Sequence, residues 1–152
     1  MLDSVGSDHA CWTLEQKQRA AADLNDLPVG IPGIEIQTRA IFSEGVSKGR
    51  ISAQRFVQVM SNEPARLLGL APRKGTIAVG SDADILLLDP NKRATIRYSE
   101  LHSKCGYEPC EGRECIGWPV MTLARGELIA RDGQFVGQAG RGQLVRRTRF
   151  AD

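Results

Sequence analysis

The pattern of residues changes sharply after Pro72, and this change constrains the fold more than any other feature of the sequence. From about residue 73 to about residue 138, short apolar stretches are separated by Gly, Ser and Asp, as in GTIAVGSDADILLLDP, ATIRY and PVMTLARGELIARDGQFV. This pattern predicts strands joined by turns, and Arg125-Gly126 and Asp132-Gly133 are the pairs best suited to positive φ. Because the stretch offers no second sheet to cover the first, we expect the missing strands to come from elsewhere.

The part of the chain before this change predicts loops and helices instead. Residues Thr13–Leu24 are helix-prone with a thin apolar stripe, which indicates a partly helical surface segment. The stretch LPVGIPGIE, Leu27–Glu35, holds two prolines and two glycines among apolar residues, so neither a helix nor a strand can run through it for long. It is expected to be a shaped loop.

Two further helices are predicted before Pro72. The apolar spacing from Ile36 to Ser47 favours a helix that ends near Gly45 or Gly49. Ser52 is a suitable N-cap for the next helix, which has an apolar face. The Asn-Glu-Pro-Ala stretch then predicts a break and a new short helix, with Asn62 as its cap.

Composition excludes little but favours a soluble, cytoplasmic protein. The formal charge is +2, from 20 Lys+Arg against 18 Asp+Glu, so neither a nucleic acid nor a membrane is an expected partner. No apolar run approaches the ~20 residues that span a bilayer, and the N-terminal residues do not resemble a secretion signal. The four cysteines are therefore expected to be reduced thiols.

Asp8, in the opening stretch VGSDHACW, is the sharpest candidate for chemistry. The stretch Val5-Gly6-Ser7-Asp8 is expected to be a strand end running into a loop. A carboxylate at such a position can bind a divalent cation through one oxygen and accept a proton from activated water with the other. The alternative from the residues alone is that Asp8 caps the following helix or turn. His9 is adjacent and is either structural or a neighbour of the site.

The thiols near His102 raise the possibility of a zinc site. Cys105, Cys110 and Cys115 follow this histidine, but their C-x4-C-x4-C spacing lacks the paired C-x2-C of common structural zinc sites. Packed thiols in a loop are the preferred interpretation. The chain also has no Gly-x-Ser-x-Gly elbow and no strand–glycine loop–helix unit for a nucleotide.

The order of four segments carries a resemblance to a known family. VGSDHACW, LPVGIPGIE, the long stretch GVSKGRISAQRFVQVMSNEPARLLGLAPRKGTIAVGSDADILLLDP and GWPVMTLARGELIARDGQFVGQAGRGQLVRR follow one another in the chain. Together they closely resemble the C-terminal third of the hydantoinase/dihydropyrimidinase family of cyclic-amide hydrolases, in the amidohydrolase superfamily. The stretch NEPARLLGL and the run KGTIAVGSDAD are shared with dihydroorotases and allantoinases, whereas the Gly-Trp-Pro-Val element is more specific to hydantoinases.

The resemblance implies an α/β fold that is incomplete in this chain. Residues 1–70 would form the last strand, a substrate loop and the terminal helices of a metal-dependent (β/α)8 TIM barrel. Residues 71–140 would form the C-terminal half of a small β-sandwich, and residues 141–152 a basic C-terminal tail. The chain is then expected to be a fragment of a longer, homo-oligomeric enzyme, a dimer or tetramer, and to be inactive by itself.

The resemblance also implies roles for two residues. Asp8 matches the aspartate that binds metal and carries a proton to the leaving ring nitrogen. Val29 stands where the family usually has an Asn whose backbone contacts the cyclic amide. The other ligands of the two zinc ions, which are a His-x-His pair, a carboxylated Lys and two more His, would precede Asp8 and are absent from this sequence.

The expected reaction is metal-dependent opening of a hydantoin or dihydropyrimidine ring to an N-carbamoyl amino acid. Two alternatives stay open: an allantoinase or dihydroorotase, which shares the metal chemistry, and a catalytically inactive scaffold of the same superfamily.

Overall fold

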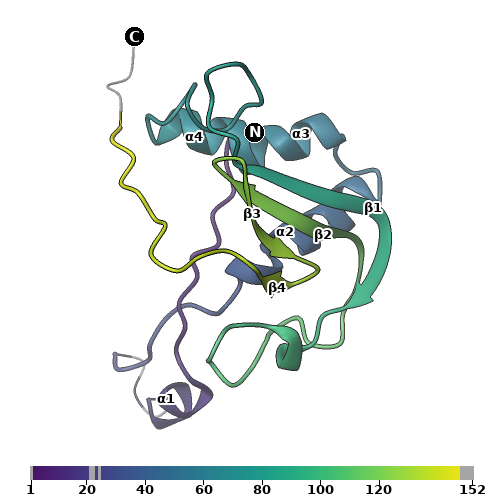
Figure 1. Cartoon of the computed structure of the whole chain (residues 1–152). Helices are drawn as coiled ribbons and strands as arrows, with labels where there is room; N and C mark the ends of the chain where they lie inside the picture. The colour runs from purple at the N-terminus through teal and green to yellow at the C-terminus, as the bar shows by residue number, and fades with distance from the viewer. Residues whose placement is uncertain (1, 21–22, 24, 148–152) are drawn as a thin grey trace.

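A computed structural model describes residues 2–20, 23 and 25–147 (Figure 1). Helices come first in the chain and a single antiparallel sheet follows. The helical elements are α1 (Leu14–Arg19), α2 (Ile34–Ile41), the π-helical turn η1 (Phe42–Val46), α3 (Ala53–Val57), the π-helical turn η2 (Gln58–Asn62), α4 (Glu63–Leu67) and the 3₁₀ turn η3 (Tyr98–Glu100). The strands are β1 (Ile85–Thr95), β2 (Glu114–Ala124), β3 (Glu127–Arg131) and β4 (Gln134–Phe135).

The sheet has the order β1-β2-β3-β4, and both turn pairs expected from the sequence connect its strands. Arg125 and Gly126 have φ of 50° and 80° between β2 and β3, and Asp132 and Gly133 have φ of 48° and 81° between β3 and β4. Two successive positive φ values match the right-handed twist of a tight hairpin. These two predictions are confirmed.

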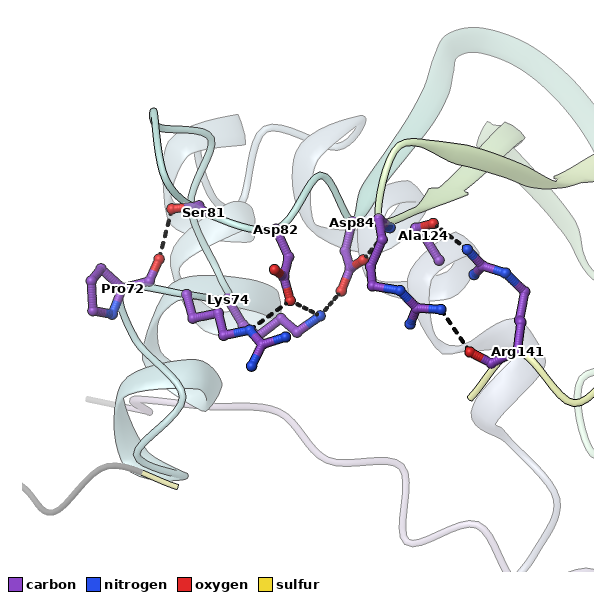
Figure 2. Close-up of polar contacts among 9 residues, drawn as sticks. Pro72, Lys74, Ser81, Asp82, Asp84, Ala124 and Arg141 are labelled. Atoms are coloured by element: carbon purple, nitrogen blue, oxygen red, sulfur yellow. Dashed lines mark hydrogen bonds and ion pairs between the residues drawn. The ribbon is translucent and has the colours of Figure 1, made fainter. Parts of the chain in front are cut away.

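The stretch before β1 was expected to contain strand, and this prediction is wrong for residues 75–84, which form turns, bends and irregular backbone. Lys74 donates to the carboxylates of both Asp82 and Asp84 (Figure 2). Arg73 Nε lies 2.9 Å from Asp82 Oδ2, and Asp84 Oδ1 accepts from the Arg125 N–H at 2.8 Å. Because both carboxylates converge on one ammonium group, the chain has to fold back on itself here and cannot extend.

The helices agree with the sequence except at one junction. The Ser52 hydroxyl accepts from the Arg55 N–H at 3.1 Å, which confirms it as the cap of α3. Asn62 is not a cap: its φ of −65° and ψ of −54° are helical, and the chain continues through η2 into α4. Pro64 lies in the first turn of α4, where a missing N–H is tolerated, and the Asn62 side chain donates to the Gly75 carbonyl.

A small core joins α2 to the sheet. Ile36, Ile96, Cys115 and Trp118 form one cluster of buried side chains, and the Arg39 guanidinium lies 4.3 Å from the centre of the Trp118 ring. These contacts hold α2 against β2, and α2 begins directly after the loop that approaches Asp8.

The backbone of β2 also touches an aromatic ring. Gly117 has φ of 91°, and a Cβ at this position would lie only 2.1 Å from Phe42 Cδ1. Only glycine therefore fits at this point of β2.

Arg141 returns from the C-terminal segment to the sheet (Figure 2). Its Nη2 donates to the Ala124 carbonyl at 2.7 Å and to Glu127 at 2.9 Å, while the Arg125 side chain donates to the Arg141 carbonyl at 2.6 Å. The predicted basic tail, 141–152, thus begins with a residue bound to the turn between β2 and β3. Residues 148–152 of that tail lie outside the described part of the chain.

Within the described residues, no helix is both long enough and apolar enough to cross a membrane.

Candidate functional site

Asp8 lies on an irregular segment that hydrogen bonds join to the rest of the molecule. The predicted strand end at Val5–Asp8 is not a strand, although Val5 N donates to the Val59 carbonyl at 3.1 Å. Asp8 has a φ of 44°, in the left-handed region, and is exposed. Its carboxylate makes no hydrogen bond or ion pair with any described residue, so both oxygens are available to a ligand.

His9 takes the capping role that was the alternative for Asp8. Its Nδ1 accepts from the N–H groups of Gly33 and Ile34 at 3.1 and 3.4 Å, at the start of α2. The N-cap residue of this helix, Gly33, has no side chain to do so. Since Nδ1 accepts, the hydrogen of the neutral ring is on Nε2. His9 therefore orients the segment that carries Asp8.

The loop Leu27–Glu35 runs beside this segment. An isolated parallel bridge pairs His9 with Ile31, and Ala10 N donates to the Ile31 carbonyl at 3.1 Å. Gly30 has φ of 99°, and a Cβ there would lie 2.5 Å from the Ala10 Cβ and 3.7 Å from the Asp8 carbonyl oxygen. Glycine thus allows the loop to pass close to the backbone of Asp8.

Val29 lies at the outer side of the loop, with its side chain exposed. Its relative exposure is 80%, and its carbonyl accepts from the Trp12 indole N–H at 3.1 Å. Lys17 Nζ donates to the neighbouring Pro28 carbonyl at 2.9 Å. Trp12 and Lys17 therefore fix the backbone of the predicted substrate loop, which sequence reasoning did not anticipate.

A cavity of about 400 Å³ is lined in part by His9, and neither Asp8 nor Val29 lines it. Its wall includes Glu35 and His102, which are joined by two bonds: His102 Nδ1 lies 2.8 Å from Glu35 Oε1, and the His102 N–H donates to Glu35 Oε2 at 2.9 Å. His102 is therefore paired with a carboxylate rather than with the nearby thiols.

The three cysteines after His102 differ in their surroundings. Cys115 belongs to the core cluster and Cys110 packs against it, while Cys105 is buried elsewhere. Burial raises the pKa of the Cys105 and Cys115 thiols. In the described residues, no three His, Cys, Asp or Glu side chains are grouped so that they could hold a metal ion.

Comparisons with known proteins agree with one another. Residues 2–129 match the Amidohydrolase family. The chain is 45% identical over 150 residues to a D-phenylhydantoinase of Escherichia coli, covering 98% of this chain and 32% of that protein.

Solved structures give the same result. A D-hydantoinase from a Bacillus species matches with a TM-score of 0.93 and 46% identity, over 99% of this chain and 33% of that one. A dihydropyrimidinase from Brevibacillus agri matches with a TM-score of 0.94 and 44% identity, over the same shares of the two chains. The chain thus spans about a third of the length of these relatives.

Proposed function

The chain belongs to the amidohydrolase family, and from that premise we propose that it serves the metal-dependent hydrolysis of a cyclic amide. The complete enzyme would open a hydantoin or dihydropyrimidine ring to an N-carbamoyl amino acid. The relatives named D-phenylhydantoinase, D-hydantoinase and dihydropyrimidinase support this choice of substrate. In the proposal, this chain supplies one carboxylate and one loop of the site.

The single observation that carries the proposal is the free carboxylate of Asp8. It is exposed, has no partner among the described residues, and stands at a left-handed position beside a histidine whose Nδ1 is already engaged. A solvent-facing aspartate without a local role is suited to bind a cation. Asp8 is accordingly the proposed metal ligand of this chain.

The described residues supply one proposed metal ligand, Asp8, and not the complete set of ligands. No cluster of three or more suitable side chains surrounds Asp8 in the part of the chain that the structure describes. The remaining ligands of the two zinc ions would come from residues that this sequence does not contain. When bound, the metal ions would polarise the ring carbonyl and activate water.

Asp8 has a second proposed role in moving a proton. One carboxylate oxygen would hold the cation, and the other would accept a proton and deliver it to the leaving ring nitrogen. No described residue donates a hydrogen bond to either oxygen, which supports this role, because a donor would compete for the same lone pairs.

Val29 is the proposed substrate contact of the loop Leu27–Glu35. The Trp12 indole already donates to one lone pair of the Val29 carbonyl, so a ring N–H of the substrate would use the second. The exposed isopropyl group would offer an apolar surface to the substrate where the family usually has an amide.

The finer description of the fold is also part of the proposal. We assign residues 1–70 to the end of a (β/α)8 barrel, 71–140 to half of a β-sandwich and 141–152 to a basic tail, in a homo-oligomeric, cytoplasmic enzyme. Apolar side chains on and before β1 are exposed to water in this chain, which supports the proposal that further strands cover them in the complete enzyme. These side chains are Ile77, Val79, Leu86 and Leu87.

A chimeric enzyme tests the proposal. The last third of the Escherichia coli D-phenylhydantoinase would be replaced by this chain, and the product assayed with hydantoin, dihydrouracil, allantoin and dihydroorotate. We expect a zinc-loaded chimera that opens hydantoin or dihydrouracil rings. A folded, zinc-loaded chimera that opens only allantoin or dihydroorotate rings, or none of the four, would contradict the assignment. Zinc binding and ring opening by the 152-residue chain alone would instead contradict the need for outside ligands.

A further inference from the structure

Two of the four free thiols lie in contact although 94 residues separate them in the chain. Cys11 Sγ is 2.8 Å from Cys105 Sγ, whereas no such sulfur contact joins Cys110 or Cys115 to another described cysteine. We propose that Cys11 and Cys105 are a redox-active pair that closes to a disulfide under oxidising conditions and reopens under reducing ones. The inference does not depend on the proposed function.

The backbone on both sides holds the two sulfurs together. Leu14 N donates to the Cys105 carbonyl at 3.1 Å, so the start of α1 is bonded directly to the Cys105 peptide. Thr13, two residues after Cys11, accepts from the Gln16 N–H at 3.1 Å and so caps the start of α1. A disulfide requires an S–S bond of about 2.05 Å, so the sulfurs need to approach by less than ~1 Å.

The two thiols differ in a way that gives each a role. Cys11 is exposed, while Cys105 is 1% exposed. Ser103 Oγ lies 2.7 Å from Cys105 Sγ and 3.5 Å from Cys11 Sγ, so it is within reach of both sulfurs. Hydrogen bonds from Cys105 and Ser103 lower the pKa of the Cys11 thiol, and burial raises the pKa of the Cys105 thiol. Cys11 is thus the thiolate that meets an oxidant and Cys105 the thiol that resolves the product.

Hydrogen peroxide is the oxidant that the proposal invokes. The Cys11 thiolate attacks one peroxide oxygen, the O–O bond breaks, and a sulfenic acid and hydroxide result. The Cys105 sulfur then attacks Cys11 Sγ, the S–O bond breaks, and its oxygen leaves as water after taking a proton. Overall, two thiols lose two hydrogens, peroxide is reduced to two waters, and a dithiol reductant reverses the change.

The bond would join two parts of the molecule that are already linked by hydrogen bonds but lie far apart in the chain. Cys11 is three residues after Asp8 on the segment that holds His9, and Cys105 belongs to the loop between η3 and β2. Oxidation would therefore tether the segment around Asp8 covalently to the loop that precedes β2. In a reducing compartment such bonds are usually transient, which fits a reversible pair better than a structural bridge.

Peptide mapping after mild oxidation tests the pair. The full chain would be treated with hydrogen peroxide without denaturant and, in parallel, in guanidinium chloride, then alkylated, digested and analysed by mass spectrometry without reduction. We expect a linked Cys11–Cys105 peptide as the main product in the native sample, removed by dithiothreitol. In guanidinium the selectivity for this pair should be lost.

Two serine variants serve as matched controls. Cys110→Ser removes a thiol outside the pair and should leave the linked peptide unchanged, whereas Cys11→Ser should abolish it and leave Cys105 reduced. Three results for the native sample would overturn the proposal. The main linkage could be Cys110–Cys115, the pairings could equal those of the denatured sample, or all four cysteines could be alkylated.

Discussion

The segment 2–33 and the body that follows it, 34–135, are held in place by different kinds of interaction. Apart from Pro32, every buried residue in the described part of the chain lies in the body, and α1 contains none. The segment is placed by polar contacts at its edges: Val5 to Val59, His9 to the start of α2, and Leu14 to Cys105. The candidate chemistry is thus on the part with no core of its own, which predicts that activity and stability respond to different substitutions.

The largest expected effect is on activity alone. In the active chimera, Asp8→Asn should lower kcat/KM about 10²–10⁴-fold, the usual contribution of a positioned acid–base group, since the amide neither carries the charge nor accepts the proton. Thermal denaturation should leave its Tm near that of the parent, because the carboxylate has no partner among the described residues. Asp3→Asn, an equally exposed change on the same segment, is the control and should be active. A large drop in Tm for Asp8→Asn would show that the residue is structural.

The second prediction is a core substitution that should change stability. Ile96 is fully buried, so Ile96→Ala should lower the free energy of unfolding by about 2–5 kcal/mol through lost burial and a residual cavity. In the 152-residue chain, where the Ile77 side chain is 84% exposed, Ile77→Ala is the matched control and should change the free energy of unfolding little. Urea denaturation measures both. If Ile96→Ala cost no more than Ile77→Ala, the body would not be stabilised by the core described above.

His9 connects the two regions, so its removal should affect both properties. His9→Ala leaves the first N–H groups of α2 without their acceptor and should cost about 0.5–2 kcal/mol, as loss of a helix cap does. It should also lower the activity of the chimera, because the ring orients the segment with Asp8. His9→Asn retains an acceptor and should recover part of both losses. Unchanged stability in His9→Ala would mean that water replaces the ring without cost.

The smallest expected effect concerns a pair of contacts inside the body. Lys48 Nζ lies 2.7 Å and Arg113 Nη2 lies 2.8 Å from Glu44 Oε1, and these hydrogen bonds lower the pKa of Glu44 from 4.5 to about 2. Because the folded pKa is below the unfolded one, the stabilisation is complete above pH 4.5 and is lost as the pH falls towards 2. Glu44→Gln should flatten the fall in Tm over that interval and change little near neutral pH, since exposed ion pairs contribute weakly. Parallel Tm profiles for the two proteins would contradict this.

The sequence predicted correctly those helix caps and turns whose interacting partners are only a few residues away. The hydroxyl of Ser52 and the turn pairs Arg125-Gly126 and Asp132-Gly133 act on neighbours a few residues away, and all three were predicted correctly. Asn62 was misassigned because its amide bonds to Gly75, thirteen residues later, and not to the next turn of helix. The strand predicted before Ile85 failed for the same reason, since Lys74 reaches across to two carboxylates.

The site depends even more on distant partners. Asp8 and Val29 were proposed from a resemblance to a family, and their roles stay predictions. His9 could not be identified as a helix cap, because its partners are 24 and 25 residues away and histidine is not a usual cap. The contact of Cys11 with Cys105 has no local signal at all.

The reciprocal bonds of Arg141 bear on where a shorter polypeptide could safely end. A boundary placed just after β4, near Val136, would look natural from secondary structure alone. Such a truncation would remove the Arg141 guanidinium, which donates to the Ala124 carbonyl, and the Arg141 carbonyl, which accepts from the Arg125 side chain. Both bonds are made at the tip of the hairpin between β2 and β3. A truncated protein that keeps Arg141 should therefore retain the geometry of this hairpin. In a protein that ends a few residues earlier, the hairpin should fray from its tip.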